Sequence, residues 1–147
     1  HERDLRTRFS AFGRICGGQM LMGAFYTGPD LLLARQAQGA ISAIWHRAMS
    51  GVDAAVVPAL PIVAPAFEGY DLDSTVGSSP RMGVFNLTGL PALAVPCGMS
   101  AAGLPIGMQV VANPFDEPTA FRVGAAFQCQ TDWHRRRSPI MEGWQRA

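Results

Sequence analysis

Residues 81–113, RMGVFNLTGLPALAVPCGMSAAGLPIGMQVVAN, decide the fold of this chain. Two short apolar runs, Leu93–Pro96 and Met108–Val111, are rich in valine and bounded by glycine and proline, which is typical of strands buried on both faces. The intervening Cys97–Pro105 holds the glycines and serine of a connecting loop. The prolines that flank the first run suit strand ends, where a missing N–H is tolerated. The stretch therefore predicts a short apolar segment, a strand, a turn and a second strand.

Helices are predicted on both sides of these strands. Gly28-Pro29-Asp30 offers a chain break and an N-cap carboxylate, and Gly51 is a stop signal. The apolar residues between them recur at helical spacing: Leu33, Ala37, Ile41, Ile44 and Ala48. A buried strand is predicted over 53–58, and Asp116 is expected to cap a later helix. The irregular segment 58–79 is interpreted as a loop that covers a pocket.

Composition bounds the class of protein. A chain of 147 residues has the length of a single domain. Its content of charged residues, 16%, is low, so part of its surface is expected to face other protein. A net charge of +1 predicts no nucleic-acid partner and no anionic membrane surface. All 12 basic residues are arginine, which excludes an amine base or a Schiff base supplied by this chain.

The cysteines indicate a reducing compartment. Three widely spaced cysteines without a CxxC pattern predict buried, reduced thiols rather than a disulfide framework or a zinc site. We therefore expect a cytoplasmic protein that needs no metal and no cofactor. The apolar run 54–67 is broken by three prolines and cannot be a membrane span. The acids Glu68, Asp71 and Asp73 are interpreted as solvated loop charges.

The residues alone show no active site. Gly98–Gly103 resembles a nucleophile elbow but has one residue too many, and a plain turn is the better interpretation. His46 is expected on a helix surface, and 134–137, HRRR, in a solvated tail. No local spacing joins a histidine to a serine and an acid. The sequence predicts a globular α/β piece with no catalytic residue of its own.

Several motifs in the chain resemble the C-terminal part of the amidase signature family. They are FNLTGLPA at 85–92, VPCG at 95–98 and GLPIGMQ at 103–109, with further matches before and after them, and the resemblance covers roughly residues 2–139. It implies an α/β/α fold around a large mixed sheet, with residues 1–147 forming the C-terminal portion of a single amidase domain. The family's Ser–Ser–Lys triad belongs to the N-terminal half. Neither the lysine nor the Gly/Ser-rich serine segment has a counterpart here.

The resemblance also implies a function for the chain. It predicts part of a hydrolase of amide carbon–nitrogen bonds, in which this chain supplies sheet core and part of the substrate pocket but is inactive alone. The expected partners are a small-molecule amide and the upstream half of the same domain, and a homodimer is left open. Alternatives are the A subunit of the tRNA-dependent glutamine amidotransferase and, from a different class, a non-catalytic binding or scaffolding module.

Candidate substrate-binding residues follow from the same resemblance. The amidotransferase A subunits hold glutamine with an Arg and an Asp, and a gapless comparison places these at Gln19 and Ser79. A neutral pair is a poor partner for the charged groups of glutamine, which favours a general amidase acting on a less polar amide. Phe25, Arg81 and Met82 are the further pocket candidates.

Overall fold

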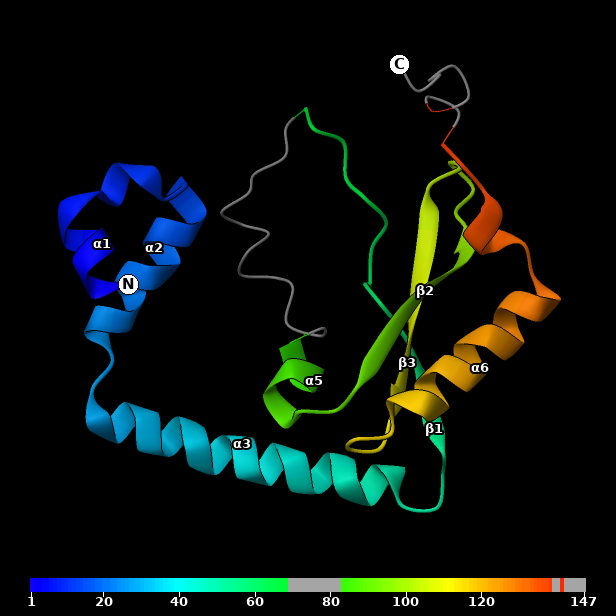
Figure 1. Cartoon of the computed structure of the whole chain (residues 1–147), viewed down its shortest axis with the longest axis horizontal. Helices are drawn as coiled ribbons and strands as arrows, with labels where there is room; N and C mark the ends of the chain where they lie inside the picture. Colours follow the sequence, from blue (N-terminus) through cyan, green and yellow to red (C-terminus); the bar gives the residue numbers. More distant parts are fainter. Residues whose placement is uncertain (69–82, 139–140, 142–147) are drawn as a thin grey trace. The chain divides into compact units, whose positions relative to one another are not determined.

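The computed structural model describes residues 1–68, 83–138 and 141 (Figure 1). The chain divides into two compact units, which we call unit 1, His1–Ala40, and unit 2, Ile41–Ala147. The helix α3, Gly28–Met49, runs across the division between them. Each unit is described below by itself.

Unit 1 consists of short helices. They are α1 (Glu2–Thr7), η1 (Phe9–Ala11), α2 (Arg14–Met22), η2 (Gly23–Phe25) and the first part of α3. Glycines lower the helix propensity of α2, but Gly17 lies under the ring of Phe9, where a Cβ would come within 3.0 Å of the ring. Gly17 is the buried residue of that helix.

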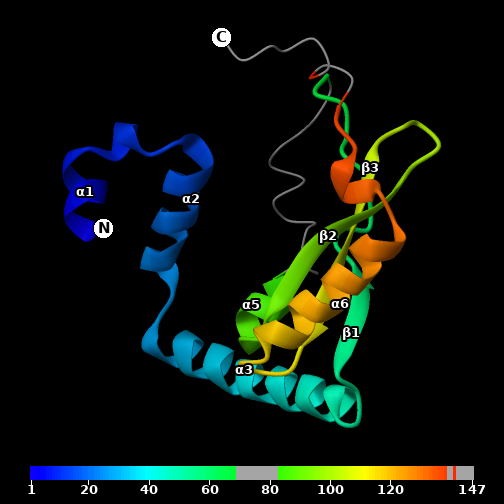
Figure 2. The ribbon, with the colours of Figure 1, turned by 45° about the vertical axis from the view of Figure 1, so that its right-hand side comes forward.

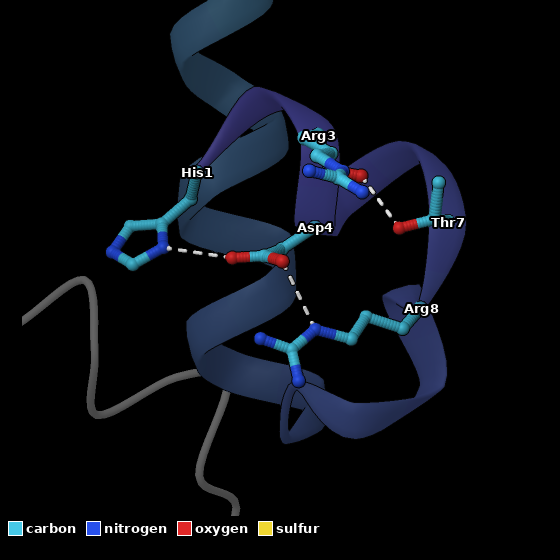
Figure 3. Close-up of polar contacts among 5 residues, drawn as sticks. All are labelled: His1, Arg3, Asp4, Thr7 and Arg8. Carbon is cyan, nitrogen blue, oxygen red and sulfur yellow. Dashed lines mark hydrogen bonds and ion pairs between the residues drawn. The ribbon is translucent and has the colours of Figure 1, made fainter.

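Polar contacts in α1 are local and lie at the surface (Figure 3). The Asp4 carboxylate accepts a 3.0 Å hydrogen bond from Nε of Arg8 and lies 3.5 Å from Nδ1 of His1. The Thr7 hydroxyl donates to the carbonyl oxygen of Arg3 at 2.8 Å. Exposed pairs of this kind contribute less than about 1 kcal/mol each.

Helix α3 confirms the predicted helix, with a change at its start. Thr27 is the capping residue: its N–H and hydroxyl donate to Oδ2 of Asp30 at 2.8 and 2.6 Å, and the Asp30 N–H returns a 3.4 Å bond to the Thr27 hydroxyl. The two residues form a reciprocal capping box, so Asp30 is the partner of the cap rather than the cap itself. Of the predicted apolar stripe, Leu33 and Ile44 are exposed.

Unit 2 is built on a three-stranded antiparallel sheet in the order β1-β3-β2. The strands are β1 (Ala54–Pro58), β2 (Ala92–Met99) and β3 (Pro105–Ala112). The predicted strand, turn and strand are confirmed, but β2 is longer than expected and takes in the first part of the predicted loop. Pro96 therefore lies inside β2 rather than at its end. It is accommodated because β2 is at the edge of the described sheet and a register shift follows between Pro96 and Gly98.

Helices cover both faces of the central strand β3. On one face, Val110 and Ala112 pack with Val95 of β2 and Ala120 of α6 (Glu117–Gln130), and Figures 1 and 2 show α6 lying along the sheet. On the other face, Val111 packs with residues of and beside α5 (Gly83–Thr88) and with Trp45 of α3. The ring centroids of Trp45 and Phe85 are 5.0 Å apart in an edge-to-face arrangement. Burial of both faces is confirmed for β3, but not for β2, which alternates between exposed and buried positions.

Two chain reversals position these helices. The Thr119 N–H donates to the Asp116 side chain at 3.3 Å, which confirms the predicted cap of α6. Gly89 ends α5 with a φ of 71°, and the N–H of Leu90 reaches back to the carbonyl of Phe85. This is the geometry of a Schellman motif at a helix C-terminus, which favours glycine.

Within the described residues, no helix combines the length and the apolar character needed to cross a membrane.

Candidate functional site

A cavity of about 530 Å³ lies at the turn end of the β2–β3 hairpin. The hairpin contributes its Pro96, Gly98, Met99 and Gly103–Pro105, and the segment that follows α6 contributes Trp133, His134 and Arg136–Ser138. The short helix η3, Trp133–Arg135, packs against β2 in this region (Figures 1 and 2). A volume of this size is in the range of small-molecule sites.

The basic segment on this cavity is held by its own contacts. The Arg136 guanidinium lies 4.3 Å from the centre of the Trp133 ring, and its Nε is 3.6 Å from Oδ1 of Asp132. Nδ1 of His134 is buried and has no hydrogen-bond partner. The prediction of a solvated tail over 134–137 is therefore wrong for His134, which is half-buried beside the hairpin. The tryptophan that precedes the basic run is the sequence signal for this packing.

A second cavity, of about 390 Å³, lies along the start of β3. Residues 59–64 form one side and Pro105–Gly107 the other. The two sides are tied by a 2.9 Å hydrogen bond from the N–H of Ala59 to the carbonyl of Gly107. Residues 59–64 of the predicted covering loop thus line a cavity, while its residues 69–79 lie outside the described residues.

The hairpin turn holds a serine that is structural. The Ser100 Oγ accepts a 3.1 Å hydrogen bond from the N–H of Leu104, and the backbone N–H of Ser100 donates to the carbonyl of Leu104. Gly103 takes a φ of 75° in the same turn. The interpretation as a plain turn is confirmed for residues 100–103, while Gly98 and Met99 belong to β2.

Cysteines and acids offer no second site in the described part of the chain. All three cysteines are free, but Cys16 and Cys129 are exposed, so the prediction of buried thiols is wrong for these two. Cys16 lies on α2 and Cys129 near the end of α6. No group of three histidine, cysteine or acidic side chains is placed to hold a metal ion among the residues described.

Only two of the five predicted substrate-binding residues lie in the described part of the chain, so the predicted set stays a prediction. Gln19 lies exposed on α2, and Phe25 is 76% exposed in η2. Ser79, Arg81 and Met82 lie outside the described residues. His46 is exposed on α3, as expected for a helix-surface residue.

Comparison with known proteins identifies the family. The pattern of the Amidase family matches residues 3–121. Among curated proteins, the A subunit of glutamyl-tRNA(Gln) amidotransferase from Rippkaea orientalis is 34% identical over 142 aligned residues, covering 92% of this chain and 30% of the relative. The chain thus spans about 30% of the length of this curated relative.

Solved structures agree with the sequence match. A crystal structure of an amidase superposes with a TM-score of 0.76 at 26% identity, over 88% of this chain and 31% of that one. The A subunit of the glutamyl-tRNA(Gln) amidotransferase from Thermotoga maritima gives a TM-score of 0.61 at 30% identity, over 74% and 24% of the two chains. These likenesses confirm the predicted α/β fold class, although the described strands pair only in antiparallel fashion. The chain belongs to the amidase family.

Proposed function

We propose that this chain supplies the sheet core and part of the substrate-binding wall of an amidase, a hydrolase of amide carbon–nitrogen bonds. The observation that carries the proposal is family membership in a chain without lysine. Attack of a hydroxyl on an amide carbonyl needs a base and a stabilised oxyanion. The family's lysine base and its two serines then come from polypeptide outside this chain, the upstream half of the same domain.

The nature of the substrate is proposed from the neutral pair Gln19 and Ser79. Charge-assisted hydrogen bonds to an α-carboxylate and an α-ammonium group need charged partners, which this pair does not supply. We therefore expect a small, less polar amide, with Phe25, Arg81 and Met82 as further parts of the wall. The curated relative belongs to an amidotransferase, so glutamine is the substrate to test against.

Cellular setting and assembly complete the proposal. The three free cysteines fit a reducing compartment, and we propose that the protein is cytoplasmic. A homodimer is compatible with the exposed apolar side chains and is tested by the oligomeric state in solution.

The test measures ammonia released from benzamide, hexanamide and glutamine. Two proteins are compared: the 1–147 chain alone, and the chain produced together with the coding sequence that precedes His1. We expect the longer protein to hydrolyse the neutral amides and the 1–147 chain to be inactive. Turnover by the 1–147 chain contradicts the proposal. Preference of the longer protein for glutamine supports the amidotransferase alternative, and no turnover by either protein supports a non-catalytic module.

A double substitution sharpens the assignment of the wall. Gln19→Arg with Ser79→Asp should raise hydrolysis of glutamine relative to hexanamide by about tenfold, because each new charge can hold one charged group of the substrate. The control is Gln36→Arg, at an exposed position of α3, combined with Ser79→Asp. An equal effect of the two double variants would show that Gln19 is not part of the pocket.

A further inference from the structure

The cavity at the hairpin turn has walls of two kinds. One part is apolar and is formed by Met99, Leu104, Pro105 and the Trp133 ring. The other is basic and carries Arg136 and Arg137. An apolar lining with a few polar groups on one side is the usual composition of a site for an amphipathic small molecule.

The two arginines differ in what they already bind. Arg136 stacks on Trp133, and its Nε lies 3.6 Å from Oδ1 of Asp132. Arg137 is exposed, and within the described residues no carboxylate pairs with it. A guanidinium has donors in a planar fork that match the two oxygens of a carboxylate. The basic part of the wall thus offers Arg136, which already contacts Asp132, and Arg137, which is unpaired among the described residues.

His134 lines the same cavity. Its Nδ1 is buried without a hydrogen-bond partner. An orphaned buried N–H is costly, so the neutral ring is better placed with its proton on Nε2 and only a lone pair on Nδ1. In that tautomer the imidazole is a donor at Nε2. The described lining groups on the basic side are then donors, and none is a carboxylate.

We propose that this cavity binds a small organic carboxylate that carries an apolar body. The carboxylate is held by Arg137 and Arg136, and the apolar body lies against Met99, Leu104 and Trp133. A bare anion leaves the apolar wall in contact with water, and a neutral apolar molecule leaves Arg137 unpaired. The two parts of the cavity therefore favour a molecule that has both a carboxylate and an apolar body. This site needs no catalytic group and stands independently of amide hydrolysis.

The binding test uses three probes with the intact protein in isothermal titration calorimetry. 3-Phenylpropanoate carries both features, 3-phenylpropan-1-ol lacks the charge, and inorganic phosphate lacks the apolar body. We expect 3-phenylpropanoate to bind at least about tenfold more tightly than either other probe, because each lacks one of the two contacts. Equal binding of the acid and the alcohol overturns the charge assignment. Tighter binding of phosphate makes the site a plain anion site and overturns the apolar half.

Neighbouring arginines provide a matched pair of variants. Arg137→Gln should weaken 3-phenylpropanoate binding by about threefold to fivefold, since a charged contact of an exposed side chain is lost. Arg135→Gln removes the same charge two positions away, at a side chain that does not line this cavity, and should leave binding within about twofold. Circular dichroism of both variants checks folding. Equal losses in the two variants contradict the proposal. The absence of binding of all three probes by the parent protein contradicts it as well.

Discussion

Among the described residues, unit 2 has a buried apolar core and unit 1 does not, although both units also expose large apolar side chains. In unit 2 two clusters of buried apolar side chains lie on the two faces of β3, and they are Phe85, Leu90, Val95, Val110, Val111, Ala112 and Ala120. In unit 1 the large apolar side chains are mostly exposed, and they are Phe9, Leu21, Met22, Phe25, Tyr26, Leu31, Leu32 and Leu33. The difference lies in which contacts each segment can make within this chain.

The comparison separates local from long-range stabilisation. Strand pairing in unit 2 joins residues as distant as Ala54 and Ala112 and lets helices cover both faces. Unit 1 has helices such as α1 and α2, of 6 and 9 residues, and neither has a side-chain hydrogen bond at its N-cap. The ion pairs of α1 join residues only four positions apart. Helices this short are marginal in water without a buried face. We therefore expect unit 1 to open before unit 2.

The largest expected effect comes from a charge placed in the unit 2 core. Val110→Asp puts a carboxylate at a position with 0% exposure on the central strand, and should lower the free energy of unfolding by about 4 kcal/mol or more. Val56→Asp makes the same change on β1 at a side chain that is 58% exposed, and should cost less than about 1 kcal/mol. Urea unfolding followed by circular dichroism measures both, and similar losses would show that β3 is not the core strand.

Helix glycines give a smaller contrast between the two units. A Cβ on Gly124 of α6 would lie 2.6 Å from Cδ2 of Leu93, whereas a Cβ on Gly18 of α2 meets nothing within 4 Å. Gly124→Val should therefore destabilise unit 2 by about 1–3 kcal/mol through overpacking. Gly18→Val should change stability by less than about 0.5 kcal/mol, in the stabilising direction. Thermal unfolding compares the two, and an unaffected Gly124→Val variant would mean that α6 and β2 separate easily.

Sequence reasoning succeeds where a pattern and its partner are close in the chain. The hairpin, the helix over 28–49, the strand over 54–58 and the cap of α6 are all predictable, because turn glycines, periodicity and an N-cap act locally. The sequence does not predict that Thr27 rather than Asp30 caps α3, because either residue type can cap a helix. Pro96 is misplaced because only the sheet order shows that β2 is an edge strand.

Contacts between distant segments could not be read from the pattern. The packing of Trp45 on Phe85 joins residues that share no local motif, and no pattern singles Trp45 out. The cavity at the hairpin turn escapes prediction for the same reason, since it joins residues near 100 to residues near 135. The sequence does not predict that Cys16 and Cys129 are exposed, because the general preference of cysteine for buried positions does not show which helix faces stay uncovered.

Removal of the α6 cap should have an intermediate effect. Asp116→Ala takes away the acceptor for the Thr119 N–H and should lower the stability of unit 2 by about 1 kcal/mol. Asp53→Ala removes the same charge at an exposed position just before β1 and should cost less than about 0.5 kcal/mol. Urea midpoints distinguish the two outcomes. Equal midpoints would show that charge, rather than the cap bond, matters at Asp116.

The capping box of α3 should show the smallest effect, as a local dependence on pH. Hydrogen bonds from the Thr27 side chain and backbone lower the pKa of Asp30 from its usual 3.8. A lowered pKa means that the box is fully formed above pH 3.8 and is lost as the pH falls through the lowered value. The amide resonance of Thr27, followed by NMR from pH 6 to pH 2, should titrate below 3.8 in the parent and stay flat in Asp30→Asn. A Thr27 amide that titrates equally in both proteins would assign the transition to another carboxylate and would leave the start of α3 without its cap.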